Sequence, residues 1–191
     1  MKMSNTIYTV RNATPSEFKD LGNLMVRVYS QLEGFPSVEE QPGYYKMLSE
    51  VGEFTGKPGT EVLVALSTEG KIVGGVVYFN DMQYYGSGGT ATQETNASGF
   101  RLLAVDAAVR GQGIGKLLIH ECIRKARNQN HSQVIIHSTR AMQVAWKMYE
   151  KMGFKRSEEL NFMLGELPVF GFRLTEPQAP KGDVKNTALE L

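Results

Sequence analysis

The segment Phe100–Glu121, FRLLAVDAAVRGQGIGKLLIHE, combines three features that decide the fold. Leu102–Val105 is a short apolar run of the kind that forms a buried strand. Glycines then recur at every second position from Gly111 to Gly115, and an amphipathic run follows. Amide groups at a helix start, with the positive end of the helix dipole behind them, can hold an anion. The segment therefore predicts a strand, a turn that accommodates a diphosphate, and a helix.

Three kinds of phosphate-binding loop compete for this turn, and their spacing separates them. A Walker loop needs four residues between its first glycine and a Gly-Lys-Ser/Thr sequence. Gly111 to Gly115 leaves three, and Leu117 stands at the position of the metal-binding hydroxyl. A dinucleotide fingerprint places its third glycine one position later, and Val134–His137 offers no acid for a ribose. Both of these sites are therefore disfavoured.

The remaining pattern, Arg110-Gly-Gln-Gly-Ile-Gly115 preceded by Leu-Ala-Val-Asp, resembles the pyrophosphate-binding signature of the GNAT N-acetyltransferase superfamily. A second block, Thr139–Phe154, resembles another part of that family, a helix that ends in Tyr-Glu-Lys-x-Gly-Phe and is followed by a strand. The two blocks stand in the family's order. The likeness extends from about Ile7 to about Thr175.

Helices that alternate with strands along the chain indicate an α/β fold. The resemblance implies one N-acetyltransferase domain over residues 1–175, with a mixed, mostly antiparallel sheet flanked by helices. In that fold two adjacent parallel strands, here residues 100–105 and 133–138, splay apart and form the acetyl-CoA cleft. Residues 176–191 have little apolar surface to bury and are expected to form a flexible tail.

Local patterns predict the remaining elements. Helices are expected over Thr14–Leu32, Val38–Val51 and Arg140–Lys151. Strands are expected over Ile7–Arg11, Glu61–Ser67, Lys71–Asn80, Gln133–His137, Phe154–Met163 and Phe170–Thr175. The polar connection Asp81–Ser98 is long for a compact domain, and loops of this sort often carry specificity.

The resemblance assigns the glycine turn to the pyrophosphate of acetyl-CoA, which its backbone amides would bind. The predicted contacts to this acetyl donor are Leu103, Ala104, Val105, Arg110, Gly111, Gln112, Gly113, Ile114, Gly115, Lys116 and Met142. An N–H within Leu103–Val105 would polarise the thioester carbonyl. Many relatives carry asparagine where this chain has Met142, so one polar contact to the cofactor arm is expected to be missing.

Tyr149 is the predicted catalytic residue. A phenol, with an ordinary pKa of about 10, is protonated at neutral pH and can donate a proton to a leaving thiolate. Helical spacing places Tyr149 on a stripe with Met142 and Ala145 that can face the cleft, and it assigns Val144 to a stripe suited to the core. The alternative role for Tyr149 is an aromatic anchor.

The base that takes up the amine proton is not assigned. Relatives often carry a glutamate near the start of the signature strand, where this chain reads Ser-Gly-Phe. Glu33, Glu94 and His137 are the candidates. The leading hypothesis is direct acetyl transfer from acetyl-CoA to a primary amine of a small molecule or a protein. The alternative is a non-catalytic acyl-CoA-binding or regulatory module of the same fold.

The composition of the chain limits the binding partners and the cellular compartment that we expect for it. The chain has 191 residues with 21 basic and 20 acidic side chains, so neither nucleic acid nor an anionic membrane is an expected partner. Its single cysteine, Cys122, suits a reducing compartment. The longest apolar run, Ile72–Phe79, is too short to span a bilayer, and a cytoplasmic location is expected. No metal site is expected, because His and Cys lack ligand spacing. Similar proteins commonly dimerise, and the sequence leaves a homodimer open.

Overall fold

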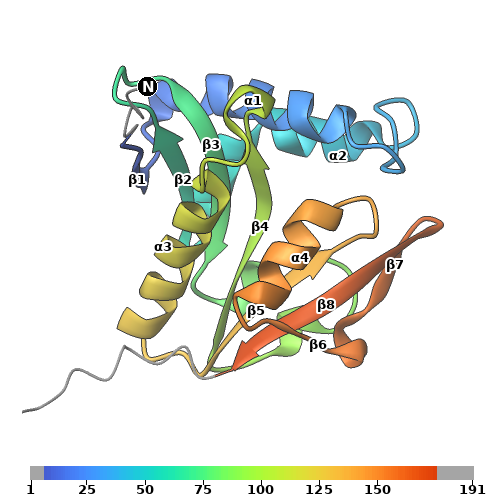
Figure 1. The fold of residues 1–191 in the computed structure, drawn as a ribbon. Coiled ribbons are helices and arrows are strands. Elements are labelled where there is room, and N and C mark those ends of the chain that lie inside the picture. The colour runs from blue at the N-terminus through green and yellow to red at the C-terminus, as the bar shows by residue number, and fades with distance from the viewer. Residues whose placement is uncertain (1–6, 176–191) are drawn as a thin grey trace, which may run out of the picture.

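The computed structural model describes residues 7–175, so the tail predicted at 176–191 lies outside the described residues. Its centre is a sheet with the strand order β1-β2-β3-β4-β5-β8-β6, and β7 pairs with β8 (Figure 1). The strand bounds are β1 Thr9–Asn12, β2 Thr60–Leu66, β3 Ile72–Phe79, β4 Ala97–Val105, β5 Gln133–Ser138, β6 Lys155–Arg156, β7 Phe162–Leu164 and β8 Leu167–Thr175. Only β4 and β5 are parallel among the described pairs. The predicted mixed, mostly antiparallel sheet is confirmed.

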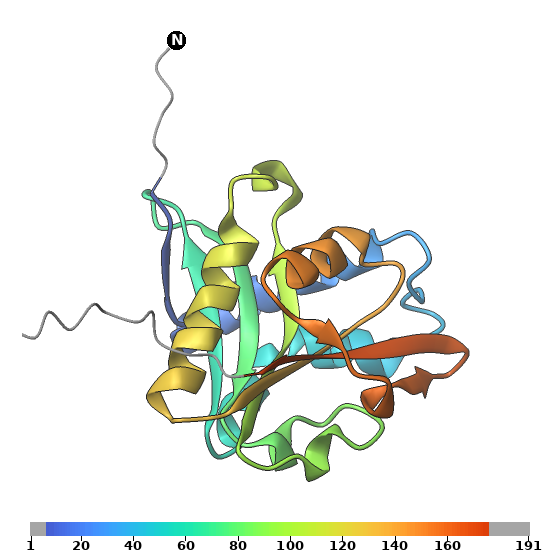
Figure 2. The same cartoon turned by 60° about the horizontal axis from the view of Figure 1, so that its bottom comes forward.

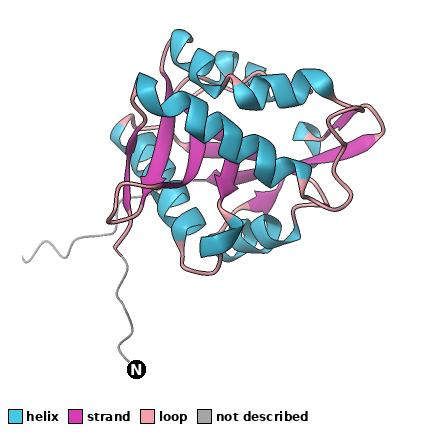
Figure 3. Cartoon of the chain, turned by 90° about the horizontal axis from the view of Figure 1, so that it is seen from above, coloured by secondary structure: helices cyan, strands magenta, loops and turns pink. Residues whose placement is uncertain are grey.

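Helices cover both faces of this sheet (Figure 3). Their bounds are α1 Phe18–Ser30, α2 Pro42–Ser49, α3 Ile114–Asn128 and α4 Gln143–Lys151. Alternate side chains of a strand point to opposite faces, and β2 shows this directly. Val62 and Val64 pack with α1 and α2, whereas Leu63 and Ala65 pack with α3. In Figure 2, α3 and α4 lie together on one side of the sheet.

The prediction of one strand over Phe154–Met163 is wrong. β6 ends at Arg156, and a 3-10 turn at Glu158–Leu160 separates it from β7. The turn forms because Leu160 is fully buried against β8. The chain passes so close to β8 there that a Cβ atom added to Gly171 would lie 2.2 Å from the Leu160 Cβ atom. Tertiary packing therefore overrides the apolar character of the segment.

The parallel strands β4 and β5 are joined at one end only. Their residue pairs are Ala97 with Gln133, Ser98 with Val134, and Gly99 with Ile135. The two strands part beyond Gly99 (Figure 1), as predicted for a splayed pair. This divergence creates the space in which the site lies.

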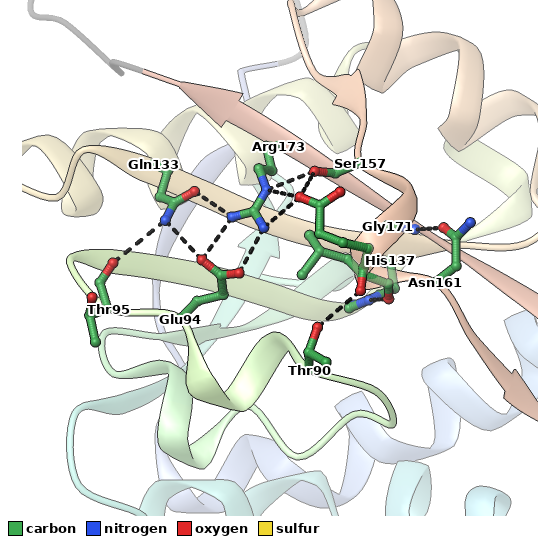
Figure 4. A network of polar contacts seen from close by, with 11 residues as sticks. Thr90, Glu94, Thr95, Gln133, His137, Ser157, Asn161, Gly171 and Arg173 are labelled. Carbon is green, nitrogen blue, oxygen red and sulfur yellow. Dashed lines mark hydrogen bonds and ion pairs between the residues drawn. The ribbon is translucent and has the colours of Figure 1, made fainter.

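A polar network holds the joined end of the two strands (Figure 4). Arg173 of β8 donates from Nη2 to Glu94 Oε1 at 2.7 Å and from Nη1 to Gln133 Oε1 at 2.6 Å. Its Nη2 also lies 2.8 Å from Glu159 Oε1. Gln133 begins β5 and Glu94 precedes β4, so one guanidinium links the starts of both strands.

Arg173→Met is expected to lower the free energy of unfolding at pH 7 by about 2 kcal/mol, because it leaves two carboxylates without their charged donor. The Arg173 hydrogen bond lowers the pKa of Glu94 below its ordinary value of 4.5. This stabilisation is complete above pH 4.5 and disappears as the pH falls further. Urea unfolding of both proteins at pH 7 and pH 3 should therefore show a difference that shrinks in acid. Arg124→Met, which breaks an exposed pair with Glu121, is the control, and an equal loss in both variants would contradict the network's role.

Candidate functional site

The parted ends of β4 and β5 open into a cavity of about 980 Å³. The predicted site residues that line it are Leu103, Val105, Arg110, Gly111, Gly113, Ile114, Gly115, Lys116, Met142 and Tyr149. Two predicted residues do not line it. The Ala104 side chain is buried within the sheet, and the Gln112 side chain points to Tyr8, whose hydroxyl donates to it. The fold thus brings two distant sequence blocks to one cavity.

The glycine turn, Arg110–Lys116, forms the wall before α3. Gly111 and Gly113 have φ values of +80° and +84°, in the left-handed region that favours glycine. A Cβ atom added to either would meet no atom within 4 Å, so the turn borders open space. The first intrahelical bond joins the Leu117 N–H to the Gly113 carbonyl at 3.0 Å. Amides from Gly111 to Lys116 have no backbone acceptor within residues 7–175, and they can therefore bind an anion.

A β-bulge in β4 borders the same cavity. The pairing with β3 shifts register between Gly75 and Val77, which places an extra residue at Leu102–Leu103. Leu102 has φ +60°, a backbone conformation that costs a non-glycine residue about 1 kcal/mol or more. The Tyr29 hydroxyl donates to the Leu103 carbonyl at 3.2 Å. Because a bulge interrupts the ladder, backbone groups of β4 become available beside the cavity.

Tyr149 lines the cavity from α4. Its ring packs against Phe100, Phe154 and Phe172 at centroid distances of 6.0, 5.8 and 6.3 Å. Burial raises the pKa of its hydroxyl, which therefore keeps its proton at neutral pH. Unlike the Tyr29 hydroxyl, that of Tyr149 has no hydrogen-bond partner in the described part of the chain. The ring is thus an aromatic anchor, and the hydroxyl is still free to act on a ligand.

The helix that carries Tyr149 differs from its prediction in two respects. α4 begins at Gln143 rather than at Arg140, because the Met142 N–H closes a turn onto the Thr139 carbonyl at 3.0 Å. The assignment of Val144 to the core is wrong, since this side chain is 84% exposed. Trp146 packs on the sheet instead, with its ring centroid 4.9 Å from that of Phe172.

Two hydroxyl groups at the end of β5 complete this wall. Ser138 Oγ and Thr139 Oγ1 are buried and have no hydrogen-bond partner among the described residues. Both residues line the cavity. Buried polar atoms are normally paired, so these two are available to a ligand. The sequence analysis missed both, although their position directly after a parallel strand was a usable signal.

Comparison with known families decides the assignment. The sequence profile of the acetyltransferase (GNAT) family matches residues 25–154. The chain belongs to the GNAT family. The matched range includes β4, the glycine turn and α4, which together build the cavity.

Two curated GNAT relatives match over short stretches. N-acetylaspartate synthetase of Xenopus tropicalis is 30% identical over 109 residues, which are 56% of this chain and 36% of that protein. Human N-acetyltransferase 8B is 35% identical over 60 residues, which are 31% of this chain and 26% of that protein. The matches therefore span about a third of the first relative and about a quarter of the second.

Solved GNAT structures match over most of the chain. An acetyltransferase of the GNAT family from Staphylococcus aureus superposes with a TM-score of 0.68 at 16% identity, covering 88% of this chain and 99% of that one. The PaiA N-acetyltransferase of Thermoplasma acidophilum, solved in complex with coenzyme A, gives a TM-score of 0.66 at 14% identity, with 86% and 98% covered. These similarities confirm the GNAT fold.

The three candidate bases differ in whether they line the cavity and in whether their side chains are already hydrogen-bonded. Glu33 is exposed outside the cavity, and Glu94 is held by Arg173. Only His137 lines the cavity, but both of its nitrogens are engaged. Nε2 donates to the Leu160 carbonyl at 2.8 Å, which leaves Nδ1 to accept from the Tyr85 hydroxyl at 3.0 Å. Burial lowers the pKa of His137 to about 4, so this ring is neutral at physiological pH.

Charge around the cavity has a single sign. Its charged lining residues are all basic, namely Arg101, Arg110, Lys116, Lys147 and Lys151. Residues 7–175 contain no cluster of three or more His, Cys, Asp or Glu side chains that could hold a metal ion. Within the same range, every helix is too short or too polar to cross a bilayer. The cavity thus provides open amides, hydroxyls and positive charge, but no carboxylate from the residues that line it.

Proposed function

We propose that this chain transfers an acetyl group from acetyl-CoA directly to a primary amine. The observation that carries the proposal is that one cavity joins the open amides of the glycine turn to the unpaired Tyr149 hydroxyl. Membership of the GNAT family supports acetyl-CoA as the donor. The PaiA structure, which contains coenzyme A in a similar fold, supports it further.

The residues present fit an extended nucleotide thioester. Amides of the glycine turn would bind the pyrophosphate, with the exposed Arg110 and Lys116 adding positive charge. Backbone groups of Leu103–Val105 beside the bulge would bind the pantetheine arm. The unpaired hydroxyls of Ser138 and Thr139 could take up the polar contact that asparagine makes in relatives. Met142 would then contribute only apolar contact.

Acetyl-CoA supplies the thioester, whose C–S bond breaks with its electron pair on sulfur as a C–N bond to the amine forms. A backbone N–H of Leu103–Val105 would polarise the carbonyl. The Tyr149 hydroxyl would give its proton to the departing sulfur and regain one from solvent. Solvent would also take the proton that nitrogen loses, since no Asp or Glu among the described residues lines the cavity. Burial in a site of low polarity raises the pKa of the Tyr149 hydroxyl. The same low polarity makes a thiolate that forms beside Tyr149 more basic as well.

Isothermal titration with acetyl-CoA, followed by thiol release with a panel of amines, tests this function. The expected result is saturable binding and thiol release that depends on the amine. Binding without amine-dependent release would support the non-catalytic acyl-CoA-binding module instead. Absence of binding would contradict both functions.

A further inference from the structure

Arg101 is the charged residue at the end of the cavity remote from the glycine turn. It lies on β4 before Leu103, whereas the glycine turn follows Val105. Strand residues advance about 3.3 Å each, so Arg101 lies beyond the bulge as seen from the pyrophosphate end. Aromatic residues border this part of the cavity from α1 and α2, where the Tyr29 and Tyr44 ring centroids are 5.9 Å apart.

The guanidinium of Arg101 is only partly used by the protein. Nη1 donates to the Tyr85 carbonyl at 2.8 Å, and the group lies 5.7 Å from the Tyr85 ring centroid. No carboxylate among residues 7–175 pairs with it, although Arg173 and Arg124 both have carboxylate partners. A partly buried guanidinium has five donors in a fork that matches a carboxylate. Arg101 lines the cavity, and the bond to the Tyr85 carbonyl uses only one of these donors.

The charge of Arg101 affects the pKa values of the surrounding tyrosines. Burial raises the pKa of Tyr44 to about 12, and the Arg101 charge acts in the opposite direction. Burial likewise raises the pKa values of Tyr29 and Tyr85, and the Arg101 charge acts to lower them. The guanidinium is therefore close to the aromatic wall that would contact an acceptor. A free ammonium ion would be repelled there, whereas an anion would be attracted.

The acceptor end of the cavity is mostly apolar, although Gln41, Ser87 and the neutral His137 also line the cavity. Its apolar lining residues include Leu32, Phe35, Met47, Phe162 and Leu164. Phe162 packs close to the loop at Gly88, where an added Cβ atom would lie 2.5 Å from its ring. This loop belongs to the connection Asp81–Ser98, for which a role in specificity was expected.

We propose that Arg101 binds a carboxylate of the acceptor, and that the acceptor is a small amine carrying both this carboxylate and an apolar group. The proposal rests on the proposed acetyl transfer and names its substrate class. Positive charge at this position would also favour the neutral form of a nearby amine, which is the form that attacks a thioester. A substrate with several ammonium groups and no anion would be excluded.

The test compares three acceptors that share an apolar body: L-phenylalanine, L-phenylalaninamide and phenethylamine. Rates of thiol release are compared at equal concentrations of the neutral amine, because the three amines differ in pKa. The wild-type chain is expected to prefer the acid over the amide by roughly 10- to 100-fold in kcat/KM, the range for a charge-assisted contact. Arg101→Gln, which keeps a donor for the Tyr85 carbonyl, should abolish this preference, and Arg101→Lys should restore part of it.

Lys57→Met is the matched control. A Cβ atom added to Gly86 would lie 3.6 Å from Arg101 Nη1 and 3.7 Å from Lys57 Nζ, so both cations lie beside this glycine. Lys57 does not line the cavity. Its removal is therefore expected to leave the acid-to-amide ratio close to the wild-type value. Loss of the ratio in Lys57→Met as well would show a general field effect and overturn the assignment to Arg101.

Other outcomes separate this proposal from the proposed function. Thiol release that is as fast with the amide, or faster with spermidine, would overturn the carboxylate site while acetyl transfer stands. An equal loss for all three acceptors in Arg101→Gln would show that Arg101 only positions the Tyr85 segment. Binding of L-phenylalanine, measured by thermal shift in the presence of coenzyme A, does not depend on turnover. Carboxylate-dependent binding that Arg101→Gln removes would support the site even if no amine were acetylated.

Discussion

Tyr149→Phe is expected to lower the turnover number about 100-fold or more, because it removes the proton donor for the leaving thiolate. The ring contacts with Phe100, Phe154 and Phe172 remain, so the melting temperature and the affinity for acetyl-CoA should change little. Such a loss of kcat without a loss of binding indicates an interaction made during the reaction. Steady-state thiol release with a productive amine measures the effect.

Tyr78→Phe provides a matched control for Tyr149→Phe. The Tyr78 hydroxyl is also buried, and it has no hydrogen-bond partner in the described range. Tyr78 does not line the cavity. Its substitution should therefore leave turnover unchanged. If Tyr149→Phe kept near-normal turnover over the pH range in which the amine is neutral, Tyr149 would have no part in proton transfer.

Gly113→Glu is expected to abolish the rise in melting temperature that acetyl-CoA causes in the wild-type chain. Ligand stabilisation depends on affinity, and the new carboxylate would project from the wall that binds the pyrophosphate. The φ value of +84° adds backbone strain of about 1 kcal/mol. Differential scanning fluorimetry with and without acetyl-CoA measures the effect.

Gly70→Glu separates loss of the site from loss of stability. Gly70 has φ +78°, and a Cβ atom there would also meet no atom within 4 Å. It lies between β2 and β3, outside the cavity. This variant carries similar strain and the same charge, so it should melt at a lower temperature and still respond to acetyl-CoA. A normal acetyl-CoA response in Gly113→Glu would show that the phosphate site lies elsewhere.

Features set by local sequence could be predicted, and features set by distant contacts could not. The glycine turn could be predicted because it needs positive φ angles at two positions, and the glycines at 111 and 113 allow them without any distant contact. The position of Tyr149 at the cavity could be predicted because a short motif fixes its place on a helix, while its catalytic role stays a prediction. Arg101, by contrast, is an ordinary strand residue until the fold places it in the same cavity as Tyr44, with no carboxylate partner among residues 7–175.

The errors have the same origin. Val144 and Trp146 are two positions apart and lie on nearly opposite faces of α4, and the direction in which β8 approaches decides which of them packs on the sheet. The break in the segment predicted as one strand over 154–163 depends on Leu160, which meets β8 only after the chain has folded back. The unpaired hydroxyls of Ser138 and Thr139 likewise follow from the parting of β4 and β5. Periodicity alone contains none of this information.

The short pairing of β4 with β5 divides the sheet into two halves, β1–β4 and β5–β8, which share backbone pairs only near Ala97–Gly99. A pantetheine arm bound between them would contact both halves and would make them unfold as one cooperative unit. Amide hydrogen exchange should then slow on acetyl-CoA binding at the parted strand ends, around Ala104 and Ile136, far more than at the outer pairing of β1 with β2. Uniform slowing throughout the sheet would indicate a domain that is already one unit before the ligand binds.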